Sequence, residues 1–240
     1  WWLDSTVTAS WTHWQRLEWL SEDTLLVHFP NPTDVATAAQ LANLVQALFA
    51  DRPDWLWDVT PGFGKLLVHY RPDRIDPLTL EQALSKALRR AVAADAQETQ
   101  SVIEIPVCYD PRVAPDLADV ATYADLSIDA VVALHCSVEY RVLAVGFALG
   151  FAYMGPLPTP IQLPRKRTPR TQVPAGSVAI AEAQTTVYPI DTPGGWHLIG
   201  RTHQPLVRLS DTIDLTLPLG SRVRFTPISY AESLTLENAR

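Results

Sequence analysis

Basic side chains capable of binding anions gather in one short segment, at positions 165, 166, 167 and 170. Between residues 165 and 201 the chain carries five Arg or Lys residues against Glu182 and Asp191, a net charge of +3, whereas the whole chain carries −7. Guanidinium groups such as those of Arg165, Arg167 and Arg170 present forked donors that suit carboxylates and phosphates. The segment therefore predicts a site for an anionic ligand or for an acidic partner surface.

Prolines at positions 164, 169 and 174 flank these cations. Because proline restricts the unfolded chain, it lowers the entropic cost of presenting the arginines in one arrangement. A solvated basic loop is the alternative interpretation of the same run.

Four further polar side chains follow on predicted neighbouring strands: Gln184, Tyr188, His197 and Arg201. They supply donors and acceptors that could line a polar pocket beside the basic segment. For each of them, a hydrogen bond within the core or at a sheet edge is the alternative.

His135 and Glu139 are candidates for acid–base chemistry, because residues four apart share one face of a helix. The alternative is a histidine at the negative end of a helix, with a carboxylate nearby.

Other kinds of site find little support. The segment PGFGK at 61–65 lacks the spacing of a phosphate-binding loop and is predicted to be a hairpin turn. Cys108 and Cys136 lie in no metal-binding spacing, so we expect no metal site and reduced thiols in the cytoplasm. An acidic chain with a pI near 5.3 argues against general nucleic-acid binding. No apolar run is long enough to span a membrane, and we expect a soluble protein.

Five of the eight tryptophans fall within the first 19 residues. This stretch lacks the pattern of a signal peptide, and we expect a variable leader whose aromatic rings pack on the protein surface. An aromatic arm that binds a partner is the alternative.

The first hundred residues predict a small α/β domain, 1–100. Strands are expected at 24–29, 55–59, 65–70 and 102–109. One helix follows a cap at Thr33 or Asp34, and a second follows a capping box of Thr79 and Gln82. This order is that of a ferredoxin-like layer, with 102–109 as its last strand.

Residues 101–240 predict a second domain. Two short helices are expected first, one with Pro115 in its first turn and the other capped by Ser127. Many short β-rich segments broken by Gly and Pro then indicate a barrel or sandwich. The Gly194–Gly195 pair is expected to adopt positive φ in a tight turn.

Three stretches carry a family resemblance: VIEIPVCYD…APDLADVA, HCSVEYRVLAVGFALGFAYMG, and PRKRTPRTQVPAGSVAIAEAQTTVYPIDTPGGWHLIGRT. They resemble the family of the bacterial 5-oxoprolinase B subunits. This family is also called allophanate hydrolase subunit 1-like and includes the sporulation kinase inhibitor KipI. The resemblance runs from about residue 17 to the end of the sequence. It implies an α+β protein, with a small α/β domain followed by a cyclophilin-like β-barrel.

The resemblance also implies a function. The B subunit acts with a homologous C subunit and with the A subunit in the ATP-dependent opening of 5-oxoproline to glutamate. ATP would then be bound unconventionally or shared with those partners. Two other functions remain open: a KipI-like inhibitor that docks on a histidine kinase, and half of a urea or allophanate-type carboxyltransferase.

The chain departs from the family pattern at several positions. Leu149 replaces a usual Pro, Glu182 and Thr186 each replace a Gly, and Asp110-Pro111 replaces a Gly pair. Glu182 could pair with one of the arginines, and Thr186 restricts a backbone that glycine leaves free. These changes put substrate handling in question more than the fold.

Overall fold

The structure is a computed structural model that describes residues 14–95, 101–210 and 213–238, with the backbone alone at 92–95. The predicted leader falls almost entirely outside these ranges. Of its tryptophans, Trp14 packs against the N-terminal core and Trp19 lies edge-on to Tyr70, with ring centroids 6.0 Å apart. None of the described helices is both long and apolar enough to cross a membrane.

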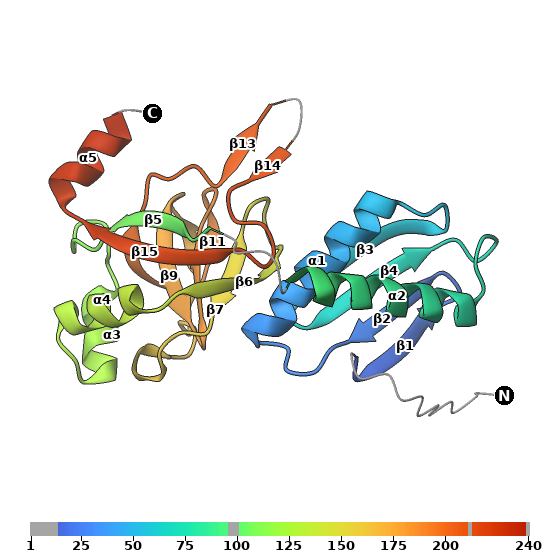
Figure 1. The fold of residues 1–240 in the computed structure, drawn as a ribbon. Coiled ribbons are helices and arrows are strands. Elements are labelled where there is room, and N and C mark those ends of the chain that lie inside the picture. Colours follow the sequence, from blue (N-terminus) through green and yellow to red (C-terminus); the bar gives the residue numbers. More distant parts are fainter. Residues whose placement is uncertain (1–13, 96–100, 211–212, 239–240) are drawn as a thin grey trace.

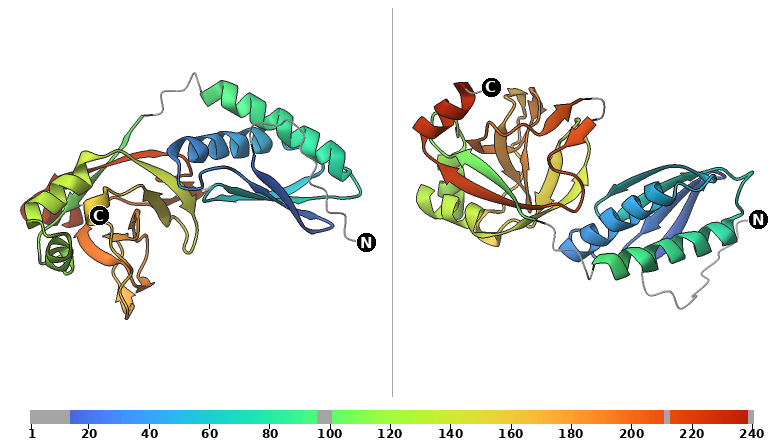
Figure 2. Two further views of the ribbon diagram at one scale, coloured as in Figure 1. Left: turned by 90° about the horizontal axis from the view of Figure 1, so that it is seen from below. Right: turned by 45° about the horizontal axis from the view of Figure 1, so that its top comes forward.

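The N-terminal part is an antiparallel sheet covered on one face by two helices (Figures 1 and 2). The strands run in the order β1-β2-β4-β3. Their bounds are Arg16–Ser21 (β1), Thr24–His28 (β2), Leu56–Gly62 (β3) and Lys65–Tyr70 (β4), and the helices are Val35–Asp51 (α1) and Pro77–Asp95 (α2). Leucines of both helices, among them Leu41 and Leu84, are buried against Leu25 and Val68 of the sheet.

The helix starts follow local hydrogen bonding. Asp34 caps α1, as predicted, by accepting the Thr37 amide at 3.2 Å. At the start of α2 the predicted cap is wrong. Asp76, three residues before Thr79, accepts the amide of Thr79 at 3.0 Å. Proline suits the first helical position, so the helix begins at Pro77 and the residue before it is the cap.

The β3–β4 connection confirms a hairpin at the PGFGK segment. Gly62 pairs with Lys65, and the two residues between them, Phe63 and Gly64, both have positive φ (47° and 65°). This is the geometry of a two-residue turn that follows the strand twist.

The predicted last strand of the layer, 102–109, belongs elsewhere. β5 (Ile103–Cys108) pairs in parallel with β15 (Arg222–Ile228), and β1 lies at the sheet edge beside β2 in its place. β1 and β2 are joined by a very short connection, so their pairing costs little loop entropy. Ile105 and Val107 are fully buried within the barrel. The domain boundary near residue 100 stays a prediction, since 96–100 lie outside the described residues.

The second part is a closed barrel of seven strands. They run β6-β15-β5-β12-β9-β10-β7, and β7 pairs back onto β6. The remaining bounds are Tyr140–Val145 (β6), Ala152–Gly155 (β7), Ser177–Ala181 (β9), Gln184–Val187 (β10) and His197–Arg201 (β12). Helices α3 (Leu117–Ala124) and α4 (Ile128–Ser137) lie together beside the barrel, and Ser127 caps α4 as predicted (Figure 1).

Smaller elements decorate the barrel. Two strands, β8 (Arg170–Val173) and β11 (Thr192–Gly194), form a separate ribbon. The others are the 3-10 turn Thr159–Ile161, the hairpin β13–β14 (Val207–Leu209 and Ile213–Leu215) and the C-terminal helix α5 (Tyr230–Asn238). Val173 of the ribbon packs with Tyr188 and Trp196 in a small cluster separate from the main barrel core.

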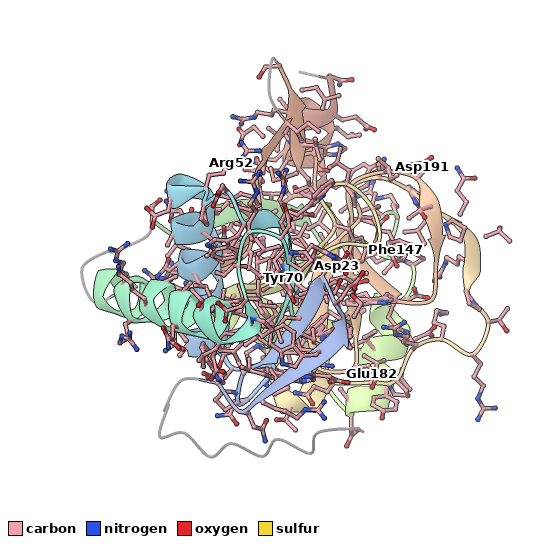
Figure 3. All side chains as sticks on the ribbon, turned by 90° about the vertical axis from the view of Figure 1, so that its right-hand side faces the viewer. Asp23, Arg52, Tyr70, Phe147, Glu182 and Asp191 are labelled. Atoms are coloured by element: carbon pink, nitrogen blue, oxygen red, sulfur yellow. The ribbon has the colours of Figure 1, made fainter. Side chains whose placement is uncertain are left out.

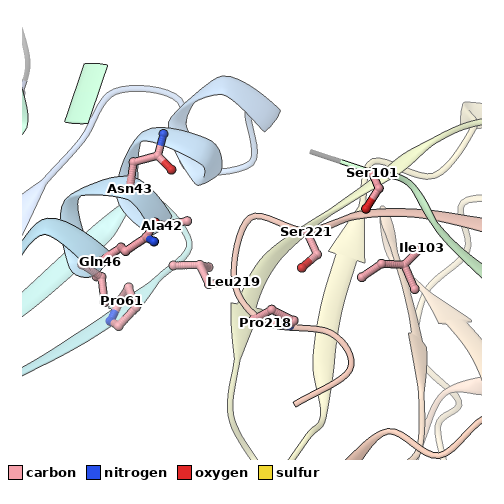
Figure 4. A pocket seen from close by; sticks show the side chains of 10 residues that line it. Ala42, Asn43, Gln46, Pro61, Ser101, Ile103, Pro218, Leu219 and Ser221 are labelled. Atoms are coloured by element: carbon pink, nitrogen blue, oxygen red, sulfur yellow. The ribbon is translucent and has the colours of Figure 1, made fainter. Parts of the chain in front are cut away.

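The two parts touch through the β3–β4 hairpin. Gly62 pairs with Ala144 of β6, and the ring of Phe63 packs edge-on against Tyr153 at 5.4 Å. A hollow of about 580 Å³ lies between the parts (Figure 4). It is lined by Ala42, Asn43, Val45, Gln46, Pro61, Ser101, Ile103, Pro218, Leu219 and Ser221. None of the predicted site residues lies in it.

Candidate functional site

Three of the four clustered cations line one hollow on the barrel, which we call the basic hollow. Its volume is about 320 Å³. The lining residues are Tyr123, Leu163, Pro164, Arg165, Lys166, Arg167, Thr168 and His197. The loop before β8 supplies the cations, α3 supplies Tyr123 and β12 supplies His197. The structure therefore brings Arg165, Arg167 and His197 together, as the sequence predicts for an anion site.

A buried carboxylate, Asp116, holds two of the cations in place. Its Oδ1 accepts from Nζ of Lys166 at 2.6 Å and from Nη2 of Arg170 at 2.7 Å, and its Oδ2 accepts the Leu198 amide at 2.7 Å. Only 2% of Asp116 is exposed. Burial opposes its ionisation, but the hydrogen bonds from Arg170, Lys166 and the amide hold its pKa below the usual value.

Sequence reasoning missed Asp116. The residue lies in the stretch APDLADVA that carries the resemblance, but its partners Lys166 and Arg170 are 50 and 54 residues further along the chain. The proline before it, at the start of a helix, was the available signal.

Two of the buried polar atoms near this cluster have no hydrogen-bond partner among the described residues: Nη1 of Arg170 and Nδ1 of His197. The other ring nitrogen of His197, Nε2, lies 3.0 Å from the carbonyl of Pro164 and therefore carries the hydrogen. An unpaired buried polar atom costs about 1–3 kcal/mol. The cluster thus retains unused hydrogen-bonding capacity.

Arg165 extends the hollow toward an aromatic cluster. Its guanidinium lies 5.8 Å from the ring centroid of Trp196, close enough for a cation–π contact. Trp196 packs with Phe151 and Tyr153 at centroid distances of 6.1 and 6.0 Å. Aromatic surface therefore supports one end of the cationic loop.

Tyr188 does not line the basic hollow. It is 1% exposed, within the cluster of Phe151 and Trp196, and burial raises its pKa to about 12. Its hydroxyl lies against Gly194, where a Cβ atom would collide with it. The predicted positive φ at Gly194 and Gly195 is wrong: glycine at 194 makes room for the tyrosine instead.

Gln184 and Arg201 also lie outside the basic hollow. Gln184 starts β10, where strand alternation places it on the same face as Thr186. Arg201 ends β12, four residues from His197, and its Nε is buried without a described partner. The pKa of Asp191 is lowered, chiefly by hydrogen bonds from the Ala175 amide and from Gln172. The positive charge of Arg201 lowers it to a smaller extent. The predicted anion-binding set is therefore divided: the hollow that Arg165, Arg167 and His197 line does not include Gln184, Tyr188 or Arg201.

The predicted acid–base pair is wrong. Helix α4 ends at Ser137, so Glu139 does not continue the face on which His135 lies. Glu139 instead binds Arg222 through two hydrogen bonds of 2.6 and 2.9 Å. His135 is completely buried and stacks on Phe225 with centroids 4.5 Å apart.

The hydrogen bonds of His135 fix its neutral form. The hydroxyl of Thr185 donates to the Ala179 carbonyl, so it accepts from Nε2 of His135 at 2.9 Å. The other nitrogen, Nδ1, then accepts from the Tyr109 hydroxyl at 2.8 Å. Burial lowers the pKa of His135 to about 3. This histidine is a structural group that joins α4 to the barrel. It lies in the last turn of the helix, as the alternative predicted, but its ring binds Tyr109 and Thr185 and no carboxylate.

The departures from the family pattern have separate structural consequences. Glu182, which is labelled in Figure 3, has φ 53°, a left-handed conformation that glycine adopts without strain. No salt bridge in the described part of the chain joins it to an arginine. Thr186 is buried and donates to the Ala152 carbonyl at 2.8 Å. Leu149 is exposed, and Asp110 binds Arg112 at 2.7 Å.

Comparison with known proteins decides the family. Residues 15–213 match the family model described as "Carboxyltransferase domain, subdomain C and D". The chain belongs to this family. It is 39% identical over 209 residues to the 5-oxoprolinase B subunit of Escherichia coli O157:H7, a match that covers 87% of this chain and 94% of that protein. The same-named protein of Haemophilus influenzae is 34% identical over 86% of this chain and 94% of its own length. The Bacillus subtilis protein of that name is 45% identical over 58% of each chain.

Solved structures agree with the family. The structure of TTHA0988 aligns with a TM-score of 0.72 and 33% identity over 86% of this chain; the match spans only 40% of that longer protein. The uncharacterized protein PH0987 of Pyrococcus horikoshii aligns at 33% identity and a TM-score of 0.52, covering 90% of this chain and 99% of its own. Kluyveromyces lactis urea carboxylase shares 16% identity at a TM-score of 0.65, over 92% of this chain and 22% of its own, and so shares the fold alone. The expected α+β fold, a ferredoxin-like layer followed by a cyclophilin-like barrel, is confirmed.

Proposed function

We propose that this chain is the B subunit of a 5-oxoprolinase complex and acts with the A and C subunits in the cytoplasm. The observation that carries the proposal is its 39% identity to a 5-oxoprolinase B subunit across 94% of that protein. The reaction is the opening of 5-oxoproline to L-glutamate at the expense of ATP. Both the substrate and ATP are anions, and the basic hollow offers cations to such groups.

The chain acts only as part of the complex. The predicted acid–base pair, His135 and Glu139, is not available for catalysis. His135 is fully buried, and Glu139 forms a salt bridge with Arg222. The basic hollow can bind and orient an anion, and among its lining residues only His197 has a side chain suited to general base catalysis. The remaining catalytic groups, and part of the ATP site, are assigned to the partner subunits.

Reconstitution tests this function. The purified chain, mixed with the A and C subunits, 5-oxoproline and ATP, should release glutamate and phosphate, and omission of any one component of the complex should abolish release. A complex in which the E. coli B subunit supports turnover serves as the positive control. Absence of glutamate release with this chain, under conditions where the control works, would refute the assignment.

A further inference from the structure

We propose that the basic hollow is a binding site for a phosphate group, held chiefly by Lys166 and Arg165. This inference deepens the proposed function, on which it rests for its place in the reaction. The site itself is argued from the charges and contacts of the hollow.

The charge balance favours phosphate over a single carboxylate. Of the four clustered cations, Lys166 and Arg170 bind the buried carboxylate Asp116, and Arg165 and Arg167 line the same hollow as Lys166. Even with Asp116 ionised, the cluster carries an excess of three positive charges. A phosphate group carries up to two negative charges near neutral pH and three strong acceptor oxygens, whereas a carboxylate carries one charge. The divalent group compensates more of the excess.

The cations are also held ready for a ligand. Asp116 fixes Lys166 with one hydrogen bond, and the Lys166 amide donates to the Gly195 carbonyl at 2.8 Å, which anchors the loop. An ammonium group has three donors, so the Asp116 contact leaves two for other acceptors. Arg165 is supported by the Trp196 ring, and neither Arg165 nor Arg167 forms a salt bridge in the described part of the chain. A loop held in this way loses little entropy when an anion binds.

The rim of the hollow offers a place for a base. Tyr123 lies on α3 at the edge, and 60% of its surface is exposed. A planar base could stack on this ring, as bases do on exposed aromatic side chains. The phosphate could thus come from a nucleotide or from a phosphorylated substrate without a base, and the binding test separates these two sources.

Calorimetric titration of the full chain with pyrophosphate, ATP and acetate tests the site. Pyrophosphate should bind more tightly than acetate, and Lys166→Gln should weaken pyrophosphate binding on the order of tenfold. Lys86→Gln is the matched control, since Lys86 is exposed on α2 and its loss removes the same charge. Arg165→Gln is a second test that remains valid even where Lys166→Gln fails to fold, because it leaves the Asp116 contacts intact. It should weaken pyrophosphate binding to a similar extent.

The outcomes are distinct. If Tyr123→Ala weakens ATP binding but not pyrophosphate binding, the phosphate belongs to a nucleotide; equal binding of both ligands, unaffected by this variant, points to a phosphorylated substrate. The proposal is overturned if acetate binds as tightly as pyrophosphate, if no ligand binds, or if Lys86→Gln weakens binding as much as Lys166→Gln. Because the titration uses the chain alone, it can succeed even where the reconstituted complex shows no turnover. Failure of the phosphate site can therefore be distinguished from failure of the proposed 5-oxoprolinase function.

Discussion

Oδ1 of Asp116 lies 2.7 Å from Nη2 of Arg170, although 54 residues separate the two along the chain. The contact joins the start of helix α3 to strand β8 and fixes one side of the cationic loop. A carboxylate that is 2% exposed cannot rely on water, so its ionised form depends on these partners.

Asp116→Asn should therefore destabilise the protein. The substitution removes the negative charge that Lys166 and Arg170 share, and breaking such a buried pair costs about 3–5 kcal/mol. Urea denaturation measures the free energy of unfolding. Asp119→Asn, in the exposed first turn of the same helix, is the control and should change it by no more than about 1 kcal/mol, the contribution of a carboxylate near a helix N-terminus. Equal effects of the two variants would show that Asp116 contributes no more than a surface carboxylate.

Stability should fall as the pH drops below neutrality because of His135. Its pKa is about 3 in the folded chain, against about 6.5 when unfolded. Between these values the unfolded chain binds a proton that the folded chain does not, so the free energy of unfolding decreases as the pH falls. The loss from this group should be about 1 kcal/mol between pH 6 and pH 5.

His135→Gln isolates this contribution. The variant should be less stable than wild type at pH 7, because the contacts to Tyr109 and Thr185 are disturbed. Its stability should nevertheless depend less on pH between 6 and 5. An unchanged pH dependence in the variant would show that the histidine does not titrate in this way.

Gly194→Ala should destabilise the aromatic cluster. The added Cβ would collide with the Tyr188 hydroxyl, and overpacking of this kind costs typically about 1–3 kcal/mol. Gly195→Ala is a close control, because there a Cβ would lie 3.7 Å from its nearest neighbours, an ordinary contact distance. Similar losses of unfolding free energy for both variants would contradict the assigned role of Gly194.

Glu182→Gly should stabilise the chain modestly. The left-handed conformation at φ 53° costs an L-residue about 1–2 kcal/mol, and glycine avoids this cost. Part of the gain is offset because glycine loses more backbone entropy on folding. We expect a gain of up to about 1 kcal/mol in urea denaturation. Glu182→Ala removes the charge but keeps the Cβ, so it should give no such gain. A gain in the alanine variant would assign the effect to charge.

The parts of the structure that depend on local sequence were predictable. Apolar spacing located both long helices, and Asp34 and Ser127 cap the helices they were expected to cap. The partner of a strand depends on distant residues. For this reason β5 was assigned to the wrong sheet, since its pairing with β15 spans more than a hundred residues.

The same distinction applies to the site. The cations at 165–167 are adjacent in sequence, and their shared hollow followed from that adjacency. Asp116 was missed because its partners come from another element. The pairing of His135 with Glu139 failed because helical spacing has meaning only while the helix continues, and α4 ends between them.

The most direct test of the central claim is the rate of 5-oxoproline-dependent glutamate release by complexes reconstituted with the A and C subunits. Three forms of this chain should be compared: wild type, Lys166→Gln and Lys86→Gln. The account predicts glutamate release with wild type and with Lys86→Gln, and a rate lower on the order of tenfold with Lys166→Gln. No release with any form, or equal release with all three, would contradict the claim that this chain serves the complex through its basic hollow.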